Sequence, residues 1–98
     1  KPETIYYIES ADNYVVIHYA SAGKQEKLMI RNTLKNIEWR FRDTQLIRCH
    51  RSFIVNLNKV QMMRRQEGEV VLDFGEERVP SIPVSKGYGE KVMSHFTK

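Results

Sequence analysis

Three consecutive polar residues, His50, Arg51 and Ser52, interrupt an otherwise apolar stretch of strand-forming residues. In a continuous strand alternate side chains share one face, so Arg51 would lie in an apolar row between Cys49 and Phe53. Burying an unpaired charge in such a row is strongly unfavourable. The strand therefore either breaks at the three polar residues or directs Arg51 toward a partner that needs a cation. Both readings place Arg51 in a functional site.

The chemistry of these residues fits recognition of a nucleic acid. A guanidinium such as that of Arg51 can donate paired hydrogen bonds to guanine O6 and N7 or to two phosphate oxygens. His50 could donate to a phosphate or act as an acid or base, although a lone histidine is more often structural. Ser52 could donate its hydroxyl or its backbone N–H to a phosphate. The alternative for Arg51 is a solvated residue in a tight turn.

An enzyme is the competing class, for example a nuclease using His50 with Arg51 or a thiol hydrolase using Cys49. Hydrolysis of the first kind needs clustered carboxylates or two converging histidines, and the sequence groups neither. Adjacent Cys49 and His50 on a strand point to opposite faces, which does not suit a nucleophile and its base. Histidine and cysteine spacing does not match metal ligands. The sequence therefore predicts no catalytic residue, metal site or cofactor, hence no enzyme.

Composition favours a small folded domain. The chain has 98 residues, of which 41% are hydrophobic and 29% charged. No apolar run approaches the roughly 20 residues that cross a bilayer, and the N-terminus has no signal-type region, so we expect no membrane contact. The single cysteine, Cys49, is expected to be a buried, reduced thiol in a cytoplasmic protein, rather than a redox sensor. A formal net charge of +4 permits a polyanionic partner.

The N-terminal half predicts a β meander followed by one helix. Residues 5–9 and 14–20 are β-branched and aromatic, and residues with turn chemistry separate them, so they predict a hairpin. A second turn at residues 21–24 leads to a third strand at residues 27–30. After Thr33, a suitable N-cap, apolar residues recur at helical spacing, with Trp39 off that stripe.

The C-terminal half predicts further short strands and a terminal helix. Residues 59–65 and 69–74 flank a turn, and the segment 74–79 contains another, so the meander continues. From Ser85, apolar residues at spacings of four predict a helix whose start is weakened by glycines. The pattern is mostly β with two short helices. It offers no adjacent helix pair for a helix-turn-helix reader.

Three segments resemble, in order, the LytTR family, the DNA-binding domain of bacterial transcription regulators. Arg48 to Asn56 resembles the family's central motif, Ile8 to Tyr19 its opening hairpin, and Ile82 to Tyr88 its closing element. The resemblance spans nearly the whole chain and implies a single LytTR-like domain over residues 1–98. The implied fold is mostly β, with short antiparallel strands in three small sheets and one or two short helices. The implied function is sequence-specific binding of double-stranded DNA by loops that enter the major groove.

The resemblance also implies which residues contact DNA. It carries a base-contacting role to the tip of the first hairpin, where Asn13 could instead serve only turn geometry. The family's third contact falls at Lys86, where many members have Arg, and a lysine fits a phosphate better than a base pair. Backbone N–H groups from Ser85 onward could bind phosphate, or Ser85 could simply cap the helix. The expected DNA-binding residues are Asn13, Tyr14, His50, Arg51, Ser52, Ser85 and Lys86.

The resemblance implies partners as well. LytTR domains typically occupy paired direct repeats, so we expect double-stranded DNA as the ligand and a dimer on it. The chain opens at Lys1 without an initiator Met, which predicts a C-terminal fragment of a longer regulator with an N-terminal receiver or sensor domain. A protein-interaction module that uses exposed strand edges remains an alternative.

Overall fold

The chain folds into short antiparallel strands with two α-helices, so the predicted mostly-β class is confirmed. The computed structural model describes residues 1–96, and the last two residues of the predicted domain lie outside this range. Its strands and helices are β1 (Ile5–Ala11), β2 (Tyr14–Ser21), β3 (Lys24–Arg31), α1 (Leu34–Arg40), β4 (Leu46–His50), β5 (Phe53–Asn56), β6 (Met62–Gln66), β7 (Glu69–Asp73), β8 (Ile82–Val84) and α2 (Gly89–Phe96).

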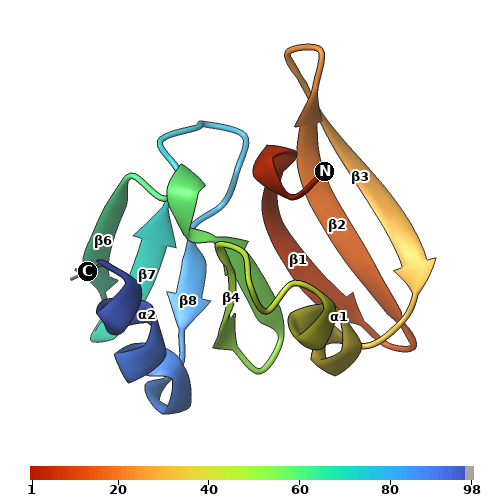
Figure 1. Cartoon of the computed structure of the whole chain (residues 1–98). Coiled ribbons are helices and arrows are strands. Elements are labelled where there is room, and N and C mark those ends of the chain that lie inside the picture. Colours follow the sequence, from red (N-terminus) through yellow and green to blue (C-terminus); the bar gives the residue numbers. More distant parts are fainter. Residues whose placement is uncertain (97–98) are drawn as a thin grey trace.

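The described strands form two sheets (Figure 1). One has the order β3-β2-β1-β5-β4 and the other the order β6-β7-β8. The expectation of three small sheets is therefore wrong. Strand β1 is hydrogen-bonded along both edges: Ile8 lies opposite Ile17 of β2 and opposite Ile54 of β5. The central hairpin consequently continues the sheet of the first hairpin instead of starting its own.

The predicted break in the central stretch is confirmed. Strand β4 ends at His50 and β5 begins at Phe53, so Arg51 and Ser52 form the turn of a tight hairpin. The pairing is irregular just before the turn, where the register shifts between Arg48 and His50. Such a shift re-aims the side chains that follow it. Arg51 is thereby removed from the apolar row and exposed to solvent.

Helix α1 begins as the sequence predicts. Thr33 is its N-cap, and its Oγ1 accepts a hydrogen bond from the backbone N–H of Asn36 at 3.1 Å. Leu34 and Ile37 face the core, while Trp39 is 66% exposed, as its position off the apolar stripe indicates. The helix lies beside β4 and directs Glu38 to the same side as Leu34, four residues earlier.

The C-terminal part differs from its prediction at the start of the last helix. Segment 74–79 forms turns and loop, and β8 follows it at Ile82–Val84. Helix α2 begins at Gly89 rather than near Ser85, because a 3₁₀ turn (Lys86–Tyr88) comes first. Ser85 precedes that turn without making a side-chain cap. Two glycines near the expected start weaken helix formation there, which agrees with the late start.

Two apolar clusters lie on either side of β4. Leu46 belongs to a cluster with α1, β1 and β2, whereas Ile47 and Cys49 belong to a cluster with β5, β7, β8 and α2. Cys49 is fully buried and free, which confirms the expected burial of this thiol. Burial raises the pKa of the Cys49 thiol to about 12.

A thiol held protonated inside the fold is expected to resist alkylation, because the thiolate is the nucleophile. In native buffer at about pH 8, iodoacetamide should modify Cys49 far more slowly than it modifies the same protein unfolded in urea. Mass spectrometry gives both rates. Equal rates would show that the side chain is accessible in the native state.

Candidate functional site

The three segments singled out in the sequence lie along one edge of the molecule. The β1–β2 turn, the β4–β5 turn and the junction between β8 and α2 all lie at the lower edge in Figure 1. The β2–β3 turn and the loop before β8 lie at the opposite end. Three segments that are about 35 residues apart in the sequence thus lie at the same edge of the molecule. We call this the loop edge: residues 12–14, 50–52 and 85–87.

Backbone hydrogen bonds tie the outer segments to the central one. The N–H of Ser10 donates to the carbonyl of Ser52 at 3.1 Å, which joins the first hairpin to the central turn. On the other side, the N–H of Ser85 donates to the carbonyl of Cys49 at 3.1 Å. The spacing of the three segments is therefore fixed by main-chain atoms and does not depend on flexible side chains.

Arg51 is the most available cation of the central turn. Its side chain is exposed, and among residues 1–96 its guanidinium has no hydrogen-bond or ion-pair partner. Its backbone carbonyl, in contrast, accepts a hydrogen bond from Nη2 of Arg48 at 2.7 Å. The main chain at Arg51 is held while the side chain stays free. A buried, paired structural charge is ruled out for Arg51.

His50 and Ser52 interact within the turn. The N–H of Ser52 donates to Nδ1 of His50 at 3.0 Å, so in the neutral ring the proton lies on Nε2. The ring also packs against Phe53 at a centroid distance of 5.5 Å. Of the two donors that the sequence offers at Ser52, the backbone N–H is therefore already bonded to His50. The Ser52 hydroxyl and His50 Nε2 remain as the available donors.

The first hairpin presents Asn13 and Tyr14 at the loop edge. Asn13 is exposed, Tyr14 is 39% exposed, and the preceding Asp12 takes a left-handed backbone conformation with φ 61°. A depression of about 250 Å³ separates Asp12 and Tyr14 from Arg51, and Lys35 of α1 also lines it. The first two segments of the loop edge therefore border one shared hollow. Lys35, which no motif identified as a site residue, contributes a cation there.

The third segment offers fewer backbone donors than expected. Because its N–H is bonded to Cys49, Ser85 cannot donate that group to a phosphate, which corrects the sequence-based expectation. Its carbonyl accepts from the N–H of Tyr88 at 3.0 Å and so closes the 3₁₀ turn. Lys86 is exposed, and its ammonium has no partner within the described residues. Lys86 is thus the available cation of this segment.

Sequence reasoning missed Arg48. Its guanidinium donates to the carbonyls of His50 and Arg51 and to Oε1 of Glu38, at 3.0, 2.7 and 3.0 Å. Arg48 shares a face of β4 with Leu46, the face that packs against α1. A charged residue on the core-facing side of a strand needs a partner, so the strand pattern alone could have indicated that Arg48 is paired. The partner itself, on another element, could not be read from the local pattern.

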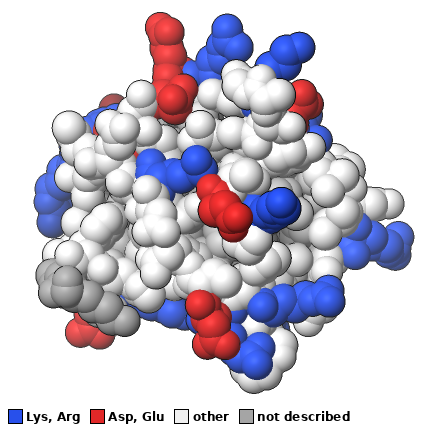
Figure 2. Space-filling view, turned by 45° about the horizontal axis from the view of Figure 1, so that its top comes forward, with Lys and Arg blue, Asp and Glu red and all other residues white. Residues whose placement is uncertain are grey.

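One face of the molecule carries mixed charge. On the face shown in Figure 2, acidic side chains alternate with basic ones, and no uniformly basic area covers it.

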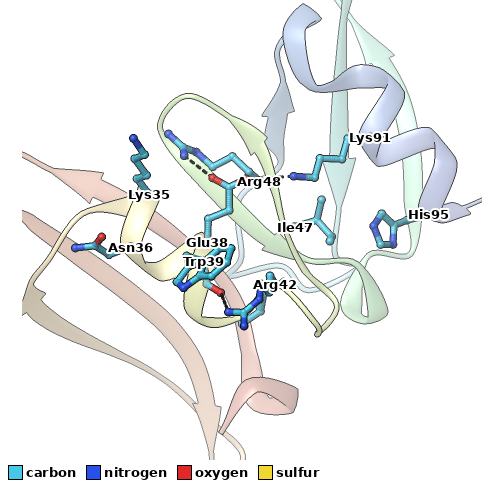
Figure 3. A pocket seen from close by; sticks show the side chains of 10 residues that line it. Lys35, Asn36, Glu38, Trp39, Arg42, Ile47, Arg48, Lys91 and His95 are labelled. Atoms are coloured by element: carbon cyan, nitrogen blue, oxygen red, sulfur yellow. Dashed lines mark hydrogen bonds and ion pairs between the residues drawn. The ribbon is translucent and has the colours of Figure 1, made fainter.

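A groove of about 540 Å³ lies between α1, β4 and α2, with Trp39 and Arg42 stacked at 3.9 Å on one side (Figure 3). None of the expected site residues lines this groove.

Two titratable side chains outside the loop edge, His18 and Tyr7, make structural contacts. His18 Nε2 lies 2.7 Å from Glu9 Oε2, and the His18 ring stacks on Tyr7 at 4.2 Å. Burial, and then the Glu9 carboxylate, raise the pKa of Tyr7. Within residues 1–96, no group of three or more His, Cys, Asp or Glu side chains could hold a metal ion. Neither α1 nor α2 has the length and apolar content needed to span a membrane.

The fold and the site together define a small β-rich module that presents polar side chains on three linked loops. Comparison with known families identifies it: the sequence profile of the LytTr DNA-binding domain matches residues 1–97, and the chain belongs to this family. The resemblance found in the sequence is thereby confirmed, and the assignment favours DNA binding over a protein-interaction module.

One solved structure supports the fold assignment. It is the LytTr DNA-binding domain of a Bacillus cereus protein described as a methyl-accepting/DNA response regulator. The TM-score is 0.79 at 22% identity, and the match covers 99% of this chain and 84% of the other. At this identity the similarity concerns the fold alone. A comparison with curated proteins gives no significant match.

The hydrogen bond inside the central turn can be tested by stability. His50→Ala removes the acceptor for the Ser52 N–H and should lower the free energy of unfolding by about 1 kcal/mol. His50→Asn should lower the free energy of unfolding by less, because an Asn side chain can accept a hydrogen bond from the N–H two residues later. Urea denaturation of the three proteins measures both values. Equal losses in the two variants would contradict the assigned role of Nδ1.

Proposed function

We propose that this domain binds double-stranded DNA in a sequence-specific manner through the loop edge, as the output domain of a transcription regulator. The observation that carries the proposal is the central turn, whose main chain is held by Arg48 while the Arg51 guanidinium is exposed and unpaired among the described residues. A free, forked cation on a fixed backbone suits base recognition. The family assignment gives the ligand class.

The proposed roles follow from side-chain chemistry. Arg51 donates to guanine O6 and N7 in the major groove, and the Asn13 carboxamide reads adenine or positions the first hairpin. Tyr14 borders the hollow between these two segments and contacts the DNA beside them. The hydroxyls of Ser52 and Ser85 and the Nε2 of His50 contact phosphates. These contacts position the domain without reading the sequence.

Lys86 has the simplest proposed role. Its ammonium is a point charge at the far end of the loop edge, so it neutralises one phosphate and does not select a base. In this proposal Arg51 recognises the base, and the flanking contacts to phosphate fix the position of the domain along the duplex.

The proposal extends to the protein that carries this domain. By family resemblance, an N-terminal receiver or sensor domain controls the domain, two copies occupy paired direct repeats, and the regulator works in the cytoplasm. Catalysis has no part in this function. The mixed charge in Figure 2 supports binding by a defined edge over adhesion of DNA to the whole surface.

Arg51→Ala tests the central contact. Loss of a base-edge contact should weaken binding to a duplex selected from a random pool by about 1 to 3 kcal/mol and relax preference at one base pair. Arg51→Lys should recover part of this loss, because it restores charge without the fork. Stability of both variants should stay within about 0.5 kcal/mol of the original, because the replaced side chain is exposed and unpaired.

A matched control is Arg78→Ala, which removes the same charge from the loop before β8 at the opposite end of the molecule. Affinity is measured by fluorescence anisotropy and stability by urea denaturation. Binding of Arg51→Ala that equals that of the Arg78→Ala control would refute the role of Arg51. Equal affinity of the original protein for selected and random duplexes would refute sequence-specific binding.

Lys86→Ala should reduce affinity for selected and random duplexes by similar factors, because a phosphate contact carries no sequence information. The slope of log K against log salt should become shallower by about 0.9, the value for one phosphate released. Lys24→Ala, at the β2–β3 turn on the far end, is the control and should leave the slope unchanged. A new base preference in Lys86→Ala would instead indicate direct reading by Lys86.

A further inference from the structure

Arg48 holds the central turn with three hydrogen bonds from one guanidinium. Nε donates to the carbonyl of His50 at 3.0 Å, and Nη2 donates to the carbonyl of Arg51 at 2.7 Å. Nη1 donates to Oε1 of Glu38 at 3.0 Å. The Arg48 side chain is only 15% exposed, and its bonds to His50 and Glu38 are partly buried, whereas its bond to the Arg51 carbonyl lies at the surface. A planar fork can satisfy acceptors in several fixed directions, which a lysine ammonium on a flexible stem cannot.

Glu38 connects this guanidinium to both helices. It comes from α1, and its second oxygen accepts from Nζ of Lys91 on α2 at 3.2 Å, so one carboxylate bridges two cations (Figure 3). Arg48 also lies 5.8 Å from the ring centre of Tyr88, just before α2. The orientation of the Arg48 fork is therefore set by elements on both sides of β4.

We propose that Arg48, oriented by Glu38, is the positioning residue that aims Arg51 at its base. This inference rests on the proposed function. The two carbonyls that Arg48 holds belong to the two peptide units that flank the Cα of Arg51, so they fix the main chain from which the Arg51 side chain projects. A displacement of a recognition group by about 1 Å is enough to lose most of a directional contact.

Arg48 acts through Arg51 and not on the DNA itself. Its three hydrogen bonds are directed to protein acceptors, and its small exposed fraction leaves little surface for a phosphate. A positioning role and a phosphate contact make opposite predictions. The first lowers specific affinity only while Arg51 is present, whereas the second lowers affinity for every duplex and reduces the salt slope.

The experiment is a double-mutant cycle of Arg48→Lys with Arg51→Ala, measured on the selected and random duplexes over a range of salt. Arg48→Lys alone should weaken binding to the selected duplex about tenfold and leave binding to random duplex and the salt slope unchanged. In the Arg51→Ala background it should change specific affinity by less than about twofold. Glu38→Gln keeps an acceptor without the charge and should show a smaller loss with the same dependence on Arg51.

Arg64→Lys is the control, because Arg64 is also a strand arginine whose guanidinium donates to two protein groups, the side chains of Asp73 and Ser81, away from the central turn. It should leave DNA binding unchanged. If urea titrations show that Arg48→Lys does not fold, the double-mutant cycle of Glu38→Gln with Arg51→Ala tests the positioning role instead. If the losses of affinity from the two substitutions simply add, Arg48 does not act through Arg51, and only the role of Arg51 itself is kept. Unchanged binding in Arg51→Ala would overturn both.

Discussion

The constraint on which the structure depends is the burial of β4 on both faces. Leu46 packs toward α1 and Ile47 toward the second sheet, so the strand lies between the two apolar clusters. It is also the edge strand of the five-stranded sheet. An edge strand in this position needs its polar groups satisfied, and the carbonyl of Cys49 accepts the N–H of Ser85. The second sheet is thereby attached to the first beside the central turn.

Because β4 is packed on both faces, the core also fixes the positions of the three segments of the loop edge. Because β5 pairs with β1 on one side and β4 contacts the β8–α2 junction on the other, the central turn has fixed neighbours in both directions. Loops usually tolerate movement, yet here the carbonyls of the turn are held by Arg48. A rigid loop carrying a free cation is what a reader without a recognition helix requires.

The elements that depend on local chemistry were predictable from the sequence. The apolar flanks and the misplaced charge of Arg51 predicted the strand break, and Thr33 with its apolar spacing predicted α1. The three motifs mark segments that the fold brings together at the loop edge. The joining of two hairpins into one sheet was not predictable, because pairing of β1 with β5 links residues far apart in the chain.

The contacts inside the site were equally beyond the local pattern. Ser52 and Ser85 both looked like backbone donors, but His50 and Cys49 occupy those N–H groups. Arg48 was visible only as a charge on a strand, because its partner Glu38 comes from a helix ten residues away in sequence. Propensity and spacing specify where polar residues fall. They do not specify which of them satisfy one another in the folded chain.

The central claim is that three segments, linked by their backbones, form one DNA-contacting edge. Amide chemical shifts recorded by NMR during titration with a selected duplex test it most directly. The account predicts that the largest changes fall at residues 12–14, 50–52 and 85–87 and are small at the β2–β3 turn and in the loop before β8. Largest changes at those two far-end loops, with the loop edge unaffected, would contradict it.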